Sequence, residues 1–145
     1  MIFDYIFNFG NLFVLPFWVL MILVPSWEKT RTIMASYIPF AVLALLYVYC
    51  FIASLDPAKL EEFANPTLPV LAQLFSDEKV MATGWVHFLV MDLFVGRWIY
   101  LNGLEKQIFT RHSLAICLFA GPMGLLSHIA TSWAMSLKKP SGEAA

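Results

Sequence analysis

The chain has 145 residues, of which 60% are hydrophobic and 13% charged, and its formal net charge is −1. Soluble domains carry roughly 25% charged residues, so this composition excludes an ordinary soluble domain and indicates a membrane protein. The near-neutral charge provides no basic surface for nucleic acid, and we expect no nucleic-acid partner.

Four apolar segments are long enough to cross a bilayer as helices, which takes about 20 residues each. They extend from about Phe7 to Val24, Ile33 to Leu55, Met81 to Leu101 and Ser113 to Leu137. None shows the alternation of a barrel strand, so we expect an all-α membrane protein with four transmembrane helices. The four would form a single domain over residues 1–140, followed by a short flexible tail at 141–145.

The segment between the second and third spans differs from the rest of the chain. Residues 56–80 mix acidic and basic side chains with leucines and phenylalanines, and Pro66 and Pro69 divide the segment. We expect two short amphipathic helices at the membrane interface. They would be either a lid over an opening toward the lipid or a plain connector.

The N-terminus and the distribution of basic residues bear on localisation and membrane orientation. The first span follows directly on the N-terminus, without a basic leader or a cleavage site, so we expect no signal or transit peptide. This favours a bacterial protein over an organelle-encoded protein or a mature form. Basic residues are balanced between the two sides, and we expect the 26–32 and 102–112 loops to face the cytoplasm.

The third span contains three ionisable side chains, His87, Asp92 and Arg97, five residues apart. Each costs about 2.5 to 3.5 kcal/mol at membrane depth, so a functional role is the first hypothesis. A step of five residues turns a helix by about 140° beyond a full turn, so the three cannot share one face. A site would therefore need other helices, and a structural Asp92–Arg97 pair is the alternative.

The fourth span supplies His128 on a stripe with Gly121 and Gly124, which suits close helix packing. We expect Pro122 to kink this helix. His128 is a candidate catalytic group or an interhelical hydrogen-bonding residue. Cys50 and Cys117 lie in apolar segments and are expected to be small core residues.

Several motifs are absent from the sequence. It contains no HExxH, no CxxCH, no nucleophile elbow and no glycine-rich phosphate loop, so we expect no cofactor and no metal. Four spans without an inverted repeat also disfavour a transporter.

Three blocks of residues together resemble a known family: Asn11-x3-Leu15-Pro16-x-Trp18, His87-x4-Asp92-Leu93-Phe94-x-Gly96-Arg97-Trp98 and Gly121-Pro122-x-Gly124. They are similar to the signature of the abscisic-acid-deficient-4-like family of small four-helix membrane proteins, associated with neoxanthin synthesis. The resemblance covers nearly the whole chain apart from the 56–80 segment and the tail.

This resemblance implies a multi-pass enzyme of a bacterial inner or thylakoid membrane, or of a plastid membrane in plant relatives. The enzyme would isomerise a carotenoid (xanthophyll) 5,6-epoxide to an allenic alcohol, without net redox change. Such a reaction needs a base for the C7 proton and an acid at the epoxide oxygen. The base would be Asp92 or His87, Arg97 would stabilise the alkoxide and His128 would donate the proton. The residues expected to bind the lipophilic substrate are Asn11, Trp18, Trp85, Phe88, Phe94 and Trp98.

Two other functions fit the same residues. The chain would be a non-enzymatic subunit of a photosynthetic complex that binds carotenoid or chlorophyll, or a haem-binding bundle, with His87 and His128 as ligands. A homo-oligomer is compatible with each of these functions. In the pigment-binding subunit the aromatic helix faces would be pigment contacts. Whatever the function, the alternative for the tryptophans near span ends is an ordinary interfacial role, and the alternative for Asn11 is to hold helices together.

Overall fold

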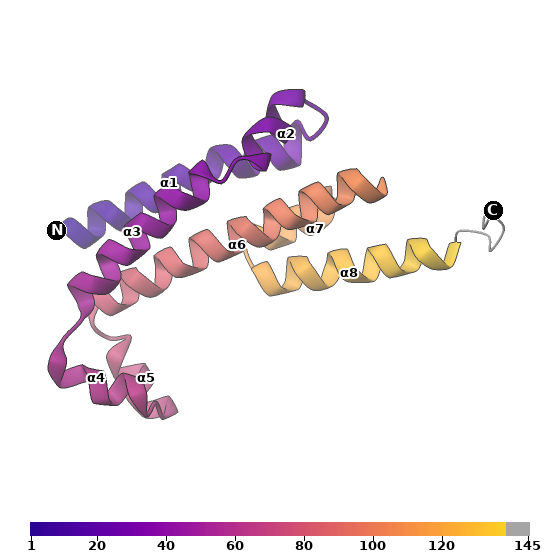
Figure 1. Ribbon diagram of the computed structural model, residues 1–145. Coiled ribbons are helices and arrows are strands. Elements are labelled where there is room, and N and C mark those ends of the chain that lie inside the picture. The colour runs from indigo at the N-terminus through magenta and orange to yellow at the C-terminus, as the bar shows by residue number, and fades with distance from the viewer. Residues whose placement is uncertain (139–145) are drawn as a thin grey trace. The chain divides into compact units, whose positions relative to one another are not determined.

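The computed structural model describes residues 1–138, and its regular elements are all α-helices (Figure 1). In chain order they are α1 (Ile2–Leu23), α2 (Glu28–Ala35), α3 (Ile38–Ser54), α4 (Pro57–Ala64), α5 (Leu68–Leu74), α6 (Glu78–Lys106), α7 (Arg111–Cys117) and α8 (Gly121–Lys138). The expected all-α architecture is confirmed for these residues. The predicted tail at 141–145 lies outside them.

Three helical stretches within residues 1–138 are long and apolar enough to cross a membrane: Ile2–Leu23, Glu28–Ser54 and Glu78–Lys106. They correspond to the first three predicted spans. Large apolar side chains such as Leu12 and Leu45 are exposed along them, as lipid-facing positions require.

The second of these stretches consists of α2 and α3, which are separated at Ser36 and Tyr37. The sequence explains the break, because Pro39 lies at the start of α3 and has no N–H to donate to the carbonyl of Ala35. Helical hydrogen bonding is therefore interrupted at this point.

The predicted fourth span differs in the structure. Instead of one helix from Ser113 to Leu137 there are two, α7 and α8, and the chain reverses at residues 118–120. The expectation of a kink at Pro122 is wrong, because this proline is the second residue of α8. Its ring would clash with the carbonyl of Leu118 in a continuous helix, whereas the first turn of a new helix accepts proline readily.

The helices α7 and α8 pack against each other as an antiparallel hairpin. The hydroxyl oxygens of Ser113 and Ser127 lie 3.0 Å apart, and Nε2 of His112 lies 3.0 Å from Oγ1 of Thr131. Both pairs join α7 to α8, and the His112–Thr131 pair lies farther from the turn than the Ser113–Ser127 pair. Polar side chains therefore connect the two arms along their length.

The segment between α3 and α6 forms two short helices, α4 and α5, as the sequence predicts. Pro57 begins α4 and Pro69 is the second residue of α5, positions where a missing N–H costs nothing. Their placement at a membrane interface stays a prediction.

The structure has two compact units. Unit 1 comprises residues Met1–Val14 and Tyr37–Val90, and unit 2 comprises Leu15–Ser36 and the chain from Met91 onward. The long helices α1 and α6 are each divided between the two units, after Val14 and after Val90. The core of unit 1 contains Phe3, Ile6, Cys50, Ala82 and Val86.

Candidate functional site

Unit 1 contains a largely apolar pocket of about 320 Å³. Small-molecule sites in proteins occupy about 300 to 1,000 Å³, so this pocket would hold one ring system rather than a whole carotenoid. Its lining comes from α3, α4 and α6, from Leu55 after α3 and from Phe75 after α5. The residues are Tyr47, Phe51, Ser54, Leu55, Leu60, Phe63, Phe75, Val80, Thr83, Gly84, His87 and Phe88.

Two of the predicted site residues, His87 and Phe88, line this pocket. The imidazole of His87 is tilted against Tyr47, with ring centroids 5.7 Å apart, and meets the edge of Phe88 at 6.1 Å. A titratable imidazole is thus held among aromatic rings. This arrangement places one group able to transfer protons beside an apolar cavity.

One wall of the pocket depends on a glycine. A Cβ atom at Gly84 would lie 2.7 Å from Cε1 of Phe75, so the Phe75 ring rests directly on the α6 backbone. Phe75 follows the last residue of α5. The absence of a side chain at position 84 therefore lets the connecting segment close against α6.

Asn11 and Trp85, also predicted to bind substrate, are brought together in unit 1. The indole N–H of Trp85 donates to Oδ1 of Asn11 at 3.0 Å, and Nδ2 of Asn11 donates to the carbonyl of Phe7 at 2.9 Å. Phe7 and Trp85 also make ring contact at 5.4 Å. Both residues serve to hold α1 against α6, the interhelical role that the sequence left as the alternative for Asn11.

In unit 2, Asp92 lies against the start of α8. A Cβ atom at Gly121 would overlap the carboxylate of Asp92, and the thiol of Cys117 donates to the backbone carbonyl of Asp92 at 3.6 Å. The first N–H groups of a helix have no partner within the helix, and its N-terminus carries partial positive charge. Asp92 therefore packs α6 against the α7–α8 hairpin at the start of α8.

Arg97 supplies the hydrogen bonds that are missing at the α2–α3 break. Its Nε donates to the carbonyl of Met34 at 2.6 Å, and an Nη donates to the carbonyl of Ala35 at 3.3 Å. The guanidinium carbon also lies 5.8 Å from the centre of the Phe94 ring, within the range of a cation–π contact. Arg97 and Phe94, both predicted site residues, thus meet in a contact that stabilises the break.

His128 is 1% exposed and hydrogen-bonds through Nε2 to Oδ1 of Asn102 at 3.0 Å. Trp98 meets its ring edge-on, with centroids 5.4 Å apart. The Nδ1 atom is buried without a hydrogen-bond partner in the described residues. His128 thus links α8 to α6, the interhelical role that the sequence left open. Trp18, the remaining predicted site residue, is buried against Gly96.

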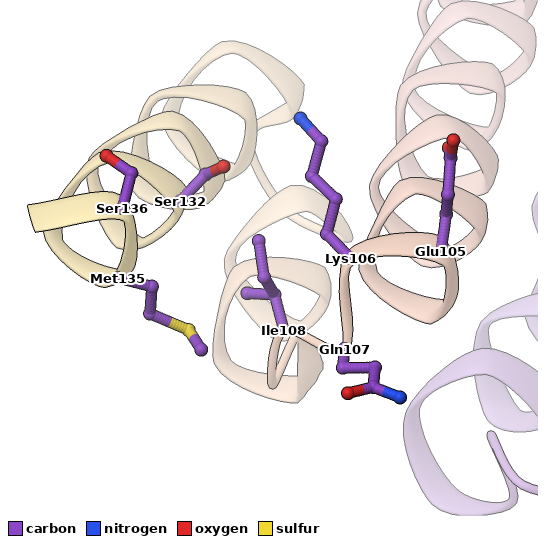
Figure 2. A pocket seen from close by; sticks show the side chains of 7 residues that line it. All are labelled: Glu105, Lys106, Gln107, Ile108, Ser132, Met135 and Ser136. Carbon is purple, nitrogen blue, oxygen red and sulfur yellow. The ribbon is translucent and has the colours of Figure 1, made fainter. Parts of the chain in front are cut away.

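Unit 2 also has a larger cavity, of about 530 Å³, between the end of α6 and α8 (Figure 2). Figure 2 shows Lys106 extending from the end of α6 toward α8, where Ser132 and Ser136 lie. None of the predicted catalytic residues lines this cavity, and most of its lining residues carry polar side chains. The pocket of unit 1 is the better candidate for an apolar substrate.

The predicted catalytic residues are therefore distributed over both units. His87 belongs to unit 1, whereas Asp92, Arg97 and His128 belong to unit 2, where each has a partner of its own. The sequence did not identify Tyr47, Phe51, Phe63 or Phe75 as pocket residues. The aromatic residues of the 56–80 segment were the available signal, through the hypothesis of a lid.

Comparison with known proteins identifies the family. The family model described as ABA DEFICIENT 4-like matches residues 5–128, a range that includes every predicted site residue. The chain belongs to the ABA4-like family. The resemblance of the three sequence blocks is thereby confirmed.

A curated relative in this family is the protein ABA DEFICIENT 4, chloroplastic, of Arabidopsis thaliana. It is 41% identical over 131 residues, which cover 87% of this chain and 60% of the relative. The chain thus spans less than two thirds of that protein's length. No solved structure matches the chain.

Proposed function

We propose that this ABA4-like protein is a membrane enzyme that isomerises a carotenoid 5,6-epoxide to an allenic alcohol, and that the pocket of unit 1 holds the reacting end group. The observation that carries the proposal is the position of His87 on an apolar cavity of ring size. Membership of the ABA4-like family supports the carotenoid substrate, and the chloroplastic relative supports a plastid or thylakoid membrane.

In this mechanism His87 is the base. Its neutral imidazole removes the C7 proton of the end group, and the electrons of the C7–H bond become the second double bond of the allene. The C6–O bond breaks, so the oxygen stays on C5 as an alkoxide. Protonation of this oxygen, with the proton regained from the imidazolium, yields the tertiary alcohol, and the product is an isomer of the substrate.

The base could be Asp92 or His87 on the sequence alone, and the proposal assigns it to His87 because only His87 lines the pocket. Tyr47 lines the same cavity and carries a hydroxyl able to donate to the developing alkoxide. Asp92, Arg97 and His128 are assigned to the packing of unit 2, because each contacts a partner there.

The test begins with protein purified in mild detergent and an absorption spectrum taken before any substrate is added. Incubation with violaxanthin and chromatography should then reveal an allenic product. The variant H87Q should lower turnover by about 10²- to 10⁴-fold, the usual contribution of a general base. H112Q is the matched control, since His112 lies in α7 of unit 2, and it should retain turnover.

Three results would overturn the proposal. A stoichiometric pigment that co-purifies without any turnover identifies a pigment-binding subunit, and a Soret band identifies a haem protein. Full turnover in H87Q removes this histidine from the mechanism.

A further inference from the structure

We propose that Thr83, together with Ser54, makes the pocket selective for end groups that carry a ring hydroxyl over those with a ring ketone or with neither group. This inference rests on the proposed function, because it concerns the same pocket. It assigns the recognition of the ring to two side chains that the isomerisation itself does not use.

Thr83 is the more buried of the two, at 7% exposed, and it lines the pocket. Its hydroxyl donates to the carbonyl of Lys79 at 2.7 Å, one turn earlier in α6. A hydroxyl has a single proton and two lone pairs, so this bond uses the donor and leaves only acceptor capacity.

Ser54, the last residue of α3, has the same hydrogen-bonding state. Its hydroxyl donates to the carbonyl of Phe51 at 2.8 Å, and the side chain lines the same pocket. Both aliphatic hydroxyls of the lining are therefore able to accept a hydrogen bond while their own protons are engaged by the backbone.

Ligands differ in whether they can donate a hydrogen bond to the side-chain oxygens of Thr83 and Ser54. A ring hydroxyl donates to them and is satisfied. A ring ketone has only lone pairs, so at Thr83 and Ser54 its oxygen would lie against another acceptor. A ring with neither hydroxyl nor ketone avoids that conflict but forms no bond to these two oxygens. A typical hydrogen bond makes the difference in affinity between the ring with a hydroxyl and the ring without one roughly fivefold to tenfold.

The spacing along α6 relates this recognition to the reaction. Thr83 and His87 are four residues apart, so they share one face of the helix about 6 Å apart along its axis. This separation is comparable to the width of a substituted six-membered ring. A ring whose hydroxyl is bound at Thr83 can thus present its epoxide side toward His87.

The test measures pigment affinity by titration in detergent with three end groups on the same polyene: the hydroxylated epoxide of violaxanthin, the epoxide of β-carotene and a ring ketone. Wild-type protein should bind the hydroxylated pigment most tightly and the ketone most weakly. T83V removes the acceptor at nearly constant volume and should bring the affinities for violaxanthin and for the epoxide of β-carotene within about twofold of each other. T83S keeps the hydroxyl and should keep the preference, and S54A should weaken it in part.

A matched control is available in α2, where the hydroxyl of Thr32 donates to the carbonyl of Glu28 at 3.1 Å in the same way but in unit 2. T32V should leave the preference unchanged. An equal preference in T83V and wild type would overturn the inference while leaving the isomerase intact. If wild-type protein bound none of the pigments, the proposed function itself would fail.

Discussion

The ring of Phe75 lies directly over Gly84, so that a Cβ atom at position 84 would come within 2.7 Å of Cε1 of Phe75. The contact closes the connecting segment against α6 and forms one wall of the pocket. The segment that the sequence suggested as a lid is therefore part of the candidate site.

Replacing Gly84 by alanine should impair pigment binding. The added methyl group forces the Phe75 ring to move, and small-to-large changes in packed sites usually cost about 1 to 3 kcal/mol. We expect pigment affinity in detergent to fall roughly tenfold, and G84A/F75L to recover much of the loss because a flexible leucine replaces the rigid ring.

G10A is the control for this substitution. A Cβ atom at Gly10 would lie 3.0 Å from Cδ1 of Leu89, the far end of a side chain that can rotate away. Unchanged affinity in G84A, or an equal loss in G10A, would show that the contact does not shape the pocket.

Gly121 should be intolerant of substitution for a different reason. Alanine there would overlap the carboxylate of Asp92. We expect a loss of about 1 to 3 kcal/mol in unfolding free energy in detergent. Shortening the partner makes room, so G121A/D92A should be destabilised by less than the sum of the two single variants. Strict additivity would mean that the two residues do not press on each other.

Arg97 should contribute to stability through the carbonyls of Met34 and Ala35. Lysine has no planar fork and cannot make both hydrogen bonds as arginine does. We therefore expect R97K to lower the unfolding free energy by about 1.5 kcal/mol. The control is R31K, on the exposed face of α2. It should change the unfolding free energy by less than about 0.5 kcal/mol. If both variants melt alike, the contact at the helix break contributes little.

The sequence predicts well the elements that depend on the length of an apolar run or on the position of prolines. Apolar runs long enough to cross a bilayer identified three spans, and the prolines of the 56–80 segment marked two short helices. The reversal at residues 118–120 was missed because the residues around it are as apolar as a continuous span. Only the Gly121-Pro122 pair marked it, and a proline inside an apolar run is compatible with a kink as well as with a helix start.

The candidate site was harder to predict than the fold. His87 stood out because an imidazole is rare in an apolar helix, and it does line the pocket. Asp92 and Arg97 stood out for the same reason, yet their partners are the helix start at Gly121 and the backbone at Ala35. Charge at membrane depth does not by itself distinguish a reacting group from one that completes backbone hydrogen bonding. Tyr47 was missed because an aromatic residue in an apolar helix is unremarkable.

The reversal between α7 and α8 bears on which compartment each end of the molecule faces. With a rise of about 1.5 Å per residue, α7 is about 10 Å long. It is too short to cross a hydrocarbon layer of about 30 Å, and α8 returns antiparallel to it. A hairpin of this kind would leave and re-enter the same side of the membrane. Three crossings would then put the start of α1 and the end of α8 in different aqueous compartments, whereas four would put them in the same one. With three crossings, fusion partners at the two ends of the protein would be exposed on opposite sides of the membrane.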